Sequence, residues 1–181
     1  PVDEEAYAAK LRALVRQFPD DAEIATLAAE AELNLHPYDW WEADGSAKSW
    51  TGAATDLLAR ALRQAPAHPG ANHYYIHIVE SSATPERALA AADRLRHLVP
   101  DSSHMVHMPS HIYIRVGQWE KAANVNRNAV QAGARYRAAF PRPGFYAMYM
   151  AHNTHFLAFV AMMQGRSAEA INGVRGGSRN S

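Results

Sequence analysis

The sequence contains no cysteine, which excludes disulfide bonds, thiolate metal sites and cysteine nucleophiles. Any metal ion must therefore be bound through nitrogen or oxygen atoms. Neither sign of charge is in excess, because 18 Lys and Arg residues balance 18 Asp and Glu residues. This balance argues against a nucleic-acid-binding surface and against a polybasic membrane patch. We therefore expect no nucleic-acid partner.

Long hydrophobic runs are also missing. The longest notable apolar run, residues 156–163, is too short to span a bilayer, so no membrane partner is expected. The first ten residues are acidic and alanine-rich, and they lack the basic and apolar regions of a signal peptide. A cytoplasmic location is the default expectation, with the reservation that a removed presequence would leave no trace.

The pattern that is present indicates helices. Apolar residues recur at intervals of about 3.6 residues, and no stretch alternates long enough to predict a strand. Proline, glycine and aspartate separate the segments. The predicted helices cover residues 4–18, 22–35, 51–65, 70–81, 85–100, 104–116, 119–134, 151–164 and 167–174. Pro109 predicts a late start or a kink in the 104–116 helix. The predicted fold class is all-α.

An internal period of 34 residues relates the central segments of the chain. A shift of 34 superposes His73 on His107, His77 on His111, Pro66 on Pro100, and Ala54 on Ala88 on Ala122. Two steps are longer: Pro19 to Pro66 exceeds the period by 13 residues, and Ala122 to Ala170 exceeds it by 14. Insertions at residues 36–48 and 135–150 account for both excesses. The chain is therefore predicted to be a helical repeat protein.

The 34-residue period, the aligned alanines and the Gly117-x-Trp119-x-x-Ala122 turn resemble the tetratricopeptide repeat (TPR). In that family, paired A and B helices stack into a right-handed α-α superhelix, or solenoid. The resemblance implies about four repeats with two insertions, in a single domain over residues 1–175 followed by a flexible tail at 176–181. The segments HPGANHYYIHIVE, HMVHMPSHIYIRVGQW and HNTHFLAF are similar to a histidine-rich bacterial TPR group of unsettled function.

The two ends of the sequence suggest a fragment of a longer chain. The 4–18 helix resembles a B helix without its A helix, and the last B helix is cut short. An unpaired terminal helix of this kind could also drive formation of a homodimer.

Ten histidines are the one compositional oddity, and eight of them lie between positions 73 and 155. Spacings of three or four residues place several of them on common helix faces. By the family's register, these faces belong to A helices and line the concave groove. The ligand-type residues that we expect there are His73, His77, Glu80, His104, His107, His111, His152 and His155.

These groove residues predict metal binding. Packed helices lie about 8–10 Å apart, a gap that two imidazoles on one ion can bridge. Two squares of ligands share His107: His73, His77, His107 and His111 in one, and His104, His107, His152 and His155 in the other. We therefore expect one or two transition-metal ions, with Glu80 as a ligand or as an outer partner. Imidazole and carboxylate donors suit Zn, Cu, Ni or Fe without choosing among them.

Three functional classes remain open: a metal-binding module, a metal-dependent enzyme, and an interaction scaffold whose histidine-lined groove binds a peptide or protein without metal. In an enzyme, a metal-bound water would react with Glu80 or Glu30 as the base. The sequence has no HExxH, GxSxG or P-loop motif.

Residues outside the groove set have two interpretations. Trp40 and Trp41, in the 36–48 insertion, either pack the insertion against the helices or line a pocket for a small ligand. His36, His68 and His97 are set aside as ordinary core or surface residues.

Overall fold

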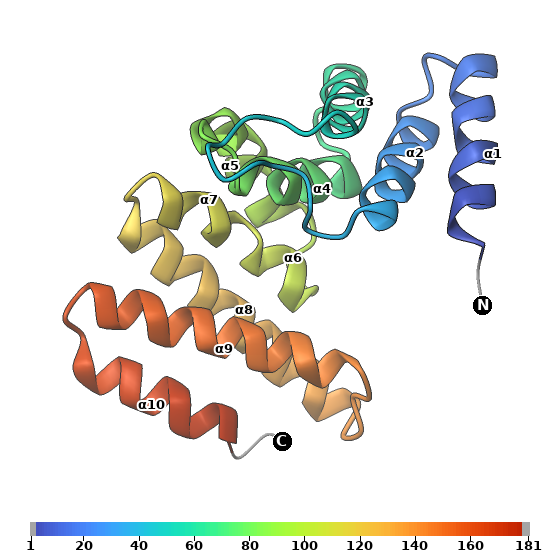
Figure 1. Ribbon diagram of the computed structural model, residues 1–181. Coiled ribbons are helices and arrows are strands. Elements are labelled where there is room, and N and C mark those ends of the chain that lie inside the picture. The colour runs from blue at the N-terminus through green and yellow to red at the C-terminus, as the bar shows by residue number, and fades with distance from the viewer. Residues whose placement is uncertain (1–2, 179–181) are drawn as a thin grey trace. The chain divides into compact units, whose positions relative to one another are not determined.

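The computed structural model describes residues 3–178 (Figure 1). Its helices are α1 (Glu4–Gln17), α2 (Ala22–Leu35), α3 (Thr51–Gln64), α4 (Pro69–Glu80), the 3-10 helix η1 (Pro85–Ala88), α5 (Leu89–Leu98), α6 (Ser103–His107), α7 (Pro109–Arg115), α8 (Trp119–Ala139), α9 (Tyr146–Met163) and α10 (Ser167–Ser178). Within the described residues there is no strand, only an isolated bridge between Trp41 and Ala47. The all-α prediction is confirmed.

The chain forms two compact units, Pro1–Ala91 and Ala92–Ser181. The single domain over residues 1–175 stays a prediction. Among the helices of residues 3–178, none has both the length and the apolar character that a bilayer span requires.

The first unit is built from packed helices with small residues between them. Helix α2 contacts α1, α3 and α4, and buried Ala28 and Ala31 of α2 pack against Ala8 and Leu11 of α1. Asp3 and Asp21 cap the first two helices by accepting hydrogen bonds from backbone N–H groups. Alanine at these contacts lets the helix backbones approach closely, which is how this unit buries a core with few large side chains.

The 36–48 segment is a loop, as predicted, and its tryptophans pack it against the first unit. Trp40 is only 6% exposed, and Trp41 Nε1 donates a hydrogen bond to the Ile78 carbonyl at 2.6 Å. Gly45 turns the loop with a φ of +82°, and a Cβ at this position would lie 3.0 Å from the Cβ of Ala83. Of the two interpretations of these tryptophans, the contacts favour packing over a ligand pocket.

The second unit centres on α8, which contacts α6, α7 and α9, and α9 in turn contacts α10. Pro109 interrupts the predicted 104–116 helix and divides it into α6 and α7. Proline has no N–H to donate into the preceding turn, but Met108 keeps helical dihedral angles (φ −49°, ψ −39°). The two short helices therefore follow one another with little change of helical phase, which keeps residues 107 and 111 on one face.

Two helix ends in the second unit use the same glycine turn. Gly117 and Gly165 both have positive φ angles, at 75° and 71°. The residue after each glycine donates its N–H back into the helix. Gln118 donates to the Tyr113 carbonyl and Arg166 donates to the Ala161 carbonyl, both at 2.8 Å. This is the left-handed cap that glycine adopts without steric cost. It ends α7 and α9 where the sequence predicts.

The extra residues at 135–150 mostly lengthen helices, so the predicted ends of the flanking helices at 134 and 151 were wrong. Helix α8 continues to Ala139, and α9 already begins at Tyr146. Good helix formers persist through residues 135–139, and Pro141 and Pro143 confine the break to residues 140–145. At the other end, α10 continues to Ser178, past the start of the predicted tail at 176. The remaining tail residues, 179–181, lie outside the described residues.

We expect Trp41→Phe to lower the free energy of unfolding by about 1–2 kcal/mol. The Ile78 carbonyl lies in the last turn of α4, where carbonyls lack helical partners, and the substitution removes its indole donor. Denaturant unfolding would measure the loss. Trp50→Phe is the matched control, because the bond from Trp50 Nε1 to the Asp39 carbonyl lies at the surface, where water replaces it. Equal losses in both variants would contradict the anchoring role of Trp41.

Candidate metal centre

Three histidine rings of the second unit converge on one point. His107 comes from the end of α6, His111 from α7 and His152 from α9. The Nε2 atom of His107 lies 3.0 Å from Nε2 of His111 and 3.0 Å from Nε2 of His152. One ligand atom from each of the three residues falls within 4.8 Å of the other two. We refer to these residues as the His107 triad.

Asn126 determines which nitrogen of His107 carries the proton. Its Nδ2 donates to the Ala122 carbonyl at 2.8 Å within α8, so its Oδ1 is the atom that faces Nδ1 of His107, at 2.6 Å. An amide oxygen can only accept. His107 therefore carries its proton on Nδ1, and its Nε2 lone pair points at the other two histidines. Ser110 Oγ also lies near this Nδ1 atom, at a distance of 3.3 Å.

A single phenyl ring packs against all three imidazoles. The Phe156 ring centroid lies 4.7 Å from that of His107, 4.6 Å from His111 and 4.7 Å from His152. His107 itself is fully buried, whereas His111 and His152 are half-buried. The triad thus combines one fully buried imidazole, His107, with two that solvent partly reaches.

The surroundings of His107 favour the neutral imidazole. Burial lowers the pKa of His107 well below its ordinary value, and the neighbouring His111 and His152 lower it further, while the hydrogen bond to Asn126 acts in the opposite direction. Burial dominates because a charged ring would lose its hydration in an apolar setting. A neutral imidazole with an oriented lone pair is the form that binds metal ions.

The spacing of the three Nε2 atoms suits a shared cation. In tetrahedral coordination with metal–nitrogen bonds of about 2.0–2.1 Å, neighbouring ligand nitrogens lie about 3.3 Å apart. The two 3.0 Å separations come close to this value. Chemically, the triad can supply three neutral nitrogen donors and no negative charge.

The other predicted ligands lie elsewhere. In the second unit, His104 packs on Tyr149 with ring centroids 4.5 Å apart, and its centroid lies 6.1 Å from that of His107. His155 is exposed on α9. The predicted square consisted of His104, His107, His152 and His155. The structure brings together the Nε2 atoms of only His107 and His152 from this square. The third histidine of the observed cluster is His111.

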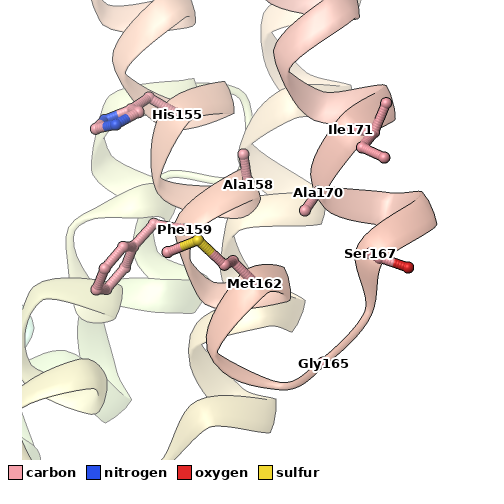
Figure 2. A pocket seen from close by; sticks show the side chains of 8 residues that line it. All are labelled: His155, Ala158, Phe159, Met162, Gly165, Ser167, Ala170 and Ile171. Carbon is pink, nitrogen blue, oxygen red and sulfur yellow. The ribbon is translucent and has the colours of Figure 1, made fainter.

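His155 instead lines an apolar recess between α9 and α10, with a volume of about 610 Å³. Figure 2 shows Phe159 and Met162 following His155 along α9, with Ala170 and Ile171 on the neighbouring α10.

His73, His77 and Glu80 lie on α4 of the first unit. Glu30 lies on α2 of the same unit. The predicted square of His73, His77, His107 and His111 joins residues of the two units and stays a prediction.

The histidines that were set aside have ordinary structural contacts. The His36 ring stacks on Trp50 at 4.3 Å, and His97 contacts Arg96 at the surface. His68 caps α4 by accepting from Ala71 N–H, with Glu23 at its other nitrogen.

Asn126 and Phe156 were missed by the sequence analysis. Asn126 had a usable signal, because it is a polar residue one helical turn after Ala122, an alanine that the 34-residue period aligns with Ala88. A buried amide needs a specific partner. Phe156 had no comparable signal, since an aromatic residue in an apolar run is ordinary core.

Comparison with known proteins supports the fold. No protein-family model and no curated protein sequence matches the chain. Solved structures do. A crystal structure of MamA superposes with a TM-score of 0.70 at 11% identity, covering 98% of this chain and 88% of MamA. A second MamA crystal structure gives a TM-score of 0.69 at 11% identity, covering 98% and 82%.

A third structure, the MamA RS-1 ArsTM double mutant, gives a TM-score of 0.68 at 16% identity, covering 97% of this chain and 85% of that one. These likenesses confirm the predicted TPR-like, all-α helical-repeat fold.

We expect metal-free protein to lose stability as the pH falls below about 6.5, the ordinary histidine pKa. The lowered pKa of His107 keeps the folded ring neutral, whereas the unfolded ring takes up a proton. Protons are therefore bound preferentially by the unfolded state. For one such group, the free energy of unfolding falls by up to about 1.4 kcal/mol for each pH unit. Above pH 6.5 this contribution is fully present.

Urea unfolding in EDTA between pH 5 and 8 would measure the effect. His107→Gln should flatten the slope, whereas His155→Gln, at an exposed position, should not. An unchanged slope in His107→Gln would show that another group controls the acid sensitivity.

Proposed function

We propose that this TPR-like protein binds one transition-metal ion through the His107 triad. The observation that carries the proposal is the convergence of three Nε2 atoms, two of them 3.0 Å from the third. Hydrogen bonding alone does not account for it well, because the single Nε2 lone pair of His107 faces two imidazole nitrogens. A cation at the common point would accept all three lone pairs at once.

The surroundings of the triad resemble those of established metal sites. A ligand histidine usually donates its second ring N–H to an oxygen acceptor, which fixes the tautomer and orients the ring. Asn126 does this for His107. An apolar shell around the ligands excludes water and strengthens binding, and Phe156 provides part of such a shell. The ligand that is hardest to desolvate is thus already buried, neutral and oriented.

Three imidazoles with no carboxylate and no thiolate favour Zn²⁺ or Cu²⁺ over the non-haem iron sites that use a carboxylate. Zn²⁺ bound by three protein ligands keeps a fourth position for water, as in catalytic zinc sites, whereas structural zinc sites use four protein ligands. Because His111 and His152 are only half-buried, water would have access to an ion that the triad held. This donor set is therefore compatible with a metal-dependent reaction.

A protein-interaction scaffold without metal is the alternative function. It is supported by the TPR-like fold and by the apolar recess between α9 and α10 (Figure 2). Phe159 and Met162 expose 37% and 60% of their surface there, and side chains of a bound peptide would cover them. In this alternative the His107 triad is a polar cluster of the core with no ligand of its own.

Elemental analysis after dialysis against Zn²⁺ distinguishes the two functions. We expect His152→Ala to lose one equivalent of metal relative to the wild type, because it removes one of three ligands at a half-buried position that tolerates truncation. His155→Ala, three residues further along α9, should keep that equivalent. If both variants and the wild type bind the same amount, the triad is not a metal site and the scaffold alternative is favoured.

Asn126→Leu should weaken Zn²⁺ binding by about 10–100-fold, the usual effect of removing an outer partner of a ligand histidine. Leucine has a similar size but removes the amide acceptor, so that Nδ1 of His107 keeps only its longer contact with Ser110 Oγ. Competition with a chromophoric chelator would measure the affinity, and circular dichroism would confirm folding. Asn128→Leu, at an exposed position of the same helix, is the matched control. Equal affinities in both variants would rule out an orienting role for Asn126.

A further inference from the structure

Helix α4 of the first unit carries a second histidine pair, formed by His73 and His77. These residues are the 34-residue equivalents of His107 and His111, and the two pairs have nearly the same geometry. The ring centroids lie 4.8 Å apart in the first pair and 4.9 Å apart in the second, and both interplanar angles are 79°. The first pair lies on an uninterrupted helix and the second spans Pro109, where Met108 keeps helical dihedral angles, so the i, i+4 spacing accounts for both arrangements.

Glu80 orients the second ring of the α4 pair. Its Oε1 lies 3.1 Å from Nδ1 of His77, and the two side chains are only 19% and 16% exposed. When His77 is neutral and donates from Nδ1, its Nε2 carries the lone pair. A carboxylate behind a histidine ligand both fixes this tautomer and raises the basicity of the ligand nitrogen.

The two pairs are supported differently. By the 34-residue shift, Asn126 corresponds to Ala92 and Ser110 to Ile76, so neither of the two polar residues beside Nδ1 of His107 recurs at its equivalent position. The support of the α4 pair comes from Glu80, on the other histidine. Glu80 in turn corresponds to Ile114. One copy of the repeat therefore holds its pair with a buried neutral amide, and the other holds its pair with a half-buried negative charge.

We infer that His73 and His77 form a second site for a divalent transition-metal ion, with Glu80 as the group that orients His77. Two histidines at positions i and i+4 of a helix present their nitrogens on one face and can bind a single ion. The His77 and Glu80 side chains are 16% and 19% exposed, whereas His107 is fully buried, so we expect this site to bind more weakly than the His107 triad. The site is independent of the proposed function, because none of its three residues belongs to the triad.

Equilibrium dialysis of the full chain against Zn²⁺ over a range of free concentrations tests the inference. We expect the wild type to bind two equivalents in a tight class and a weaker class. His73→Ala combined with His77→Ala should abolish the weaker class and leave the tight class intact, which also shows that the variant is folded. Glu80→Gln should weaken the weaker class by about tenfold. His97→Ala, a surface histidine outside both sites, is the control.

The outcomes separate this inference from the proposed function. Loss of the weaker class in the double variant supports the α4 site, even if His152→Ala changes nothing and the triad proposal fails. Identical binding in the double variant and the wild type, or a single class that only His152→Ala removes, overturns the α4 site. An unchanged weaker class in Glu80→Gln contradicts the orienting role of Glu80.

Discussion

The hydrogen bond between Asn126 and the fully buried His107 is the constraint on which the candidate site depends. An imidazole can be buried at low cost only if it is neutral and its N–H has an acceptor. Asn126 supplies that acceptor, and its own N–H is used by the Ala122 carbonyl, so the amide cannot rotate without losing a bond. The direction of the His107 lone pair is therefore set from within α8. This leaves Nε2 of His107 with a lone pair whose direction is already determined. The other side chains of the cluster, His111, His152 and Phe156, pack around that nitrogen.

The helical repeat explains how one chain presents the same pair of ligand residues twice. Repetition conserves the i, i+4 spacing, and the equal ring geometry of His73–His77 and His107–His111 shows that the spacing carries the arrangement with it. What repetition does not conserve is the surroundings: an amide in one copy and a carboxylate in the other. If both proposed sites bind metal, these different surroundings would give the same pair of histidines different affinities.

Most of the fold was predictable because its signals are local. Helix periods, the proline stops and the glycine caps at Gly117 and Gly165 each act within a few residues, and Pro109 divides the helix where proline chemistry requires. The prediction was wrong at residues 135–150, where it relied on the length of the repeat and not on local helix signals. The extra residues at 135–150 were expected to stand outside the flanking helices, yet helix-forming residues carry α8 to Ala139 and only the prolines of the 140–145 segment stop it. The TPR-like resemblance placed extra residues at 135–150 but did not predict that most of them extend the flanking helices.

The sequence by itself determined that the chain is all-α, that it repeats, and that ligand-type side chains share helix faces, because helical periodicity and residue chemistry are properties of neighbours along the chain. Only the tertiary structure decided which of those side chains meet. His152 and His155 differ by one turn on α9, and sequence spacing treats them alike. The packing of α9 against α6 and α8 brings Nε2 of His152 to the triad and leaves His155 in the recess beside α10. That choice depends on how one helix is rotated against its neighbours, which is the sum of many contacts between residues far apart in sequence.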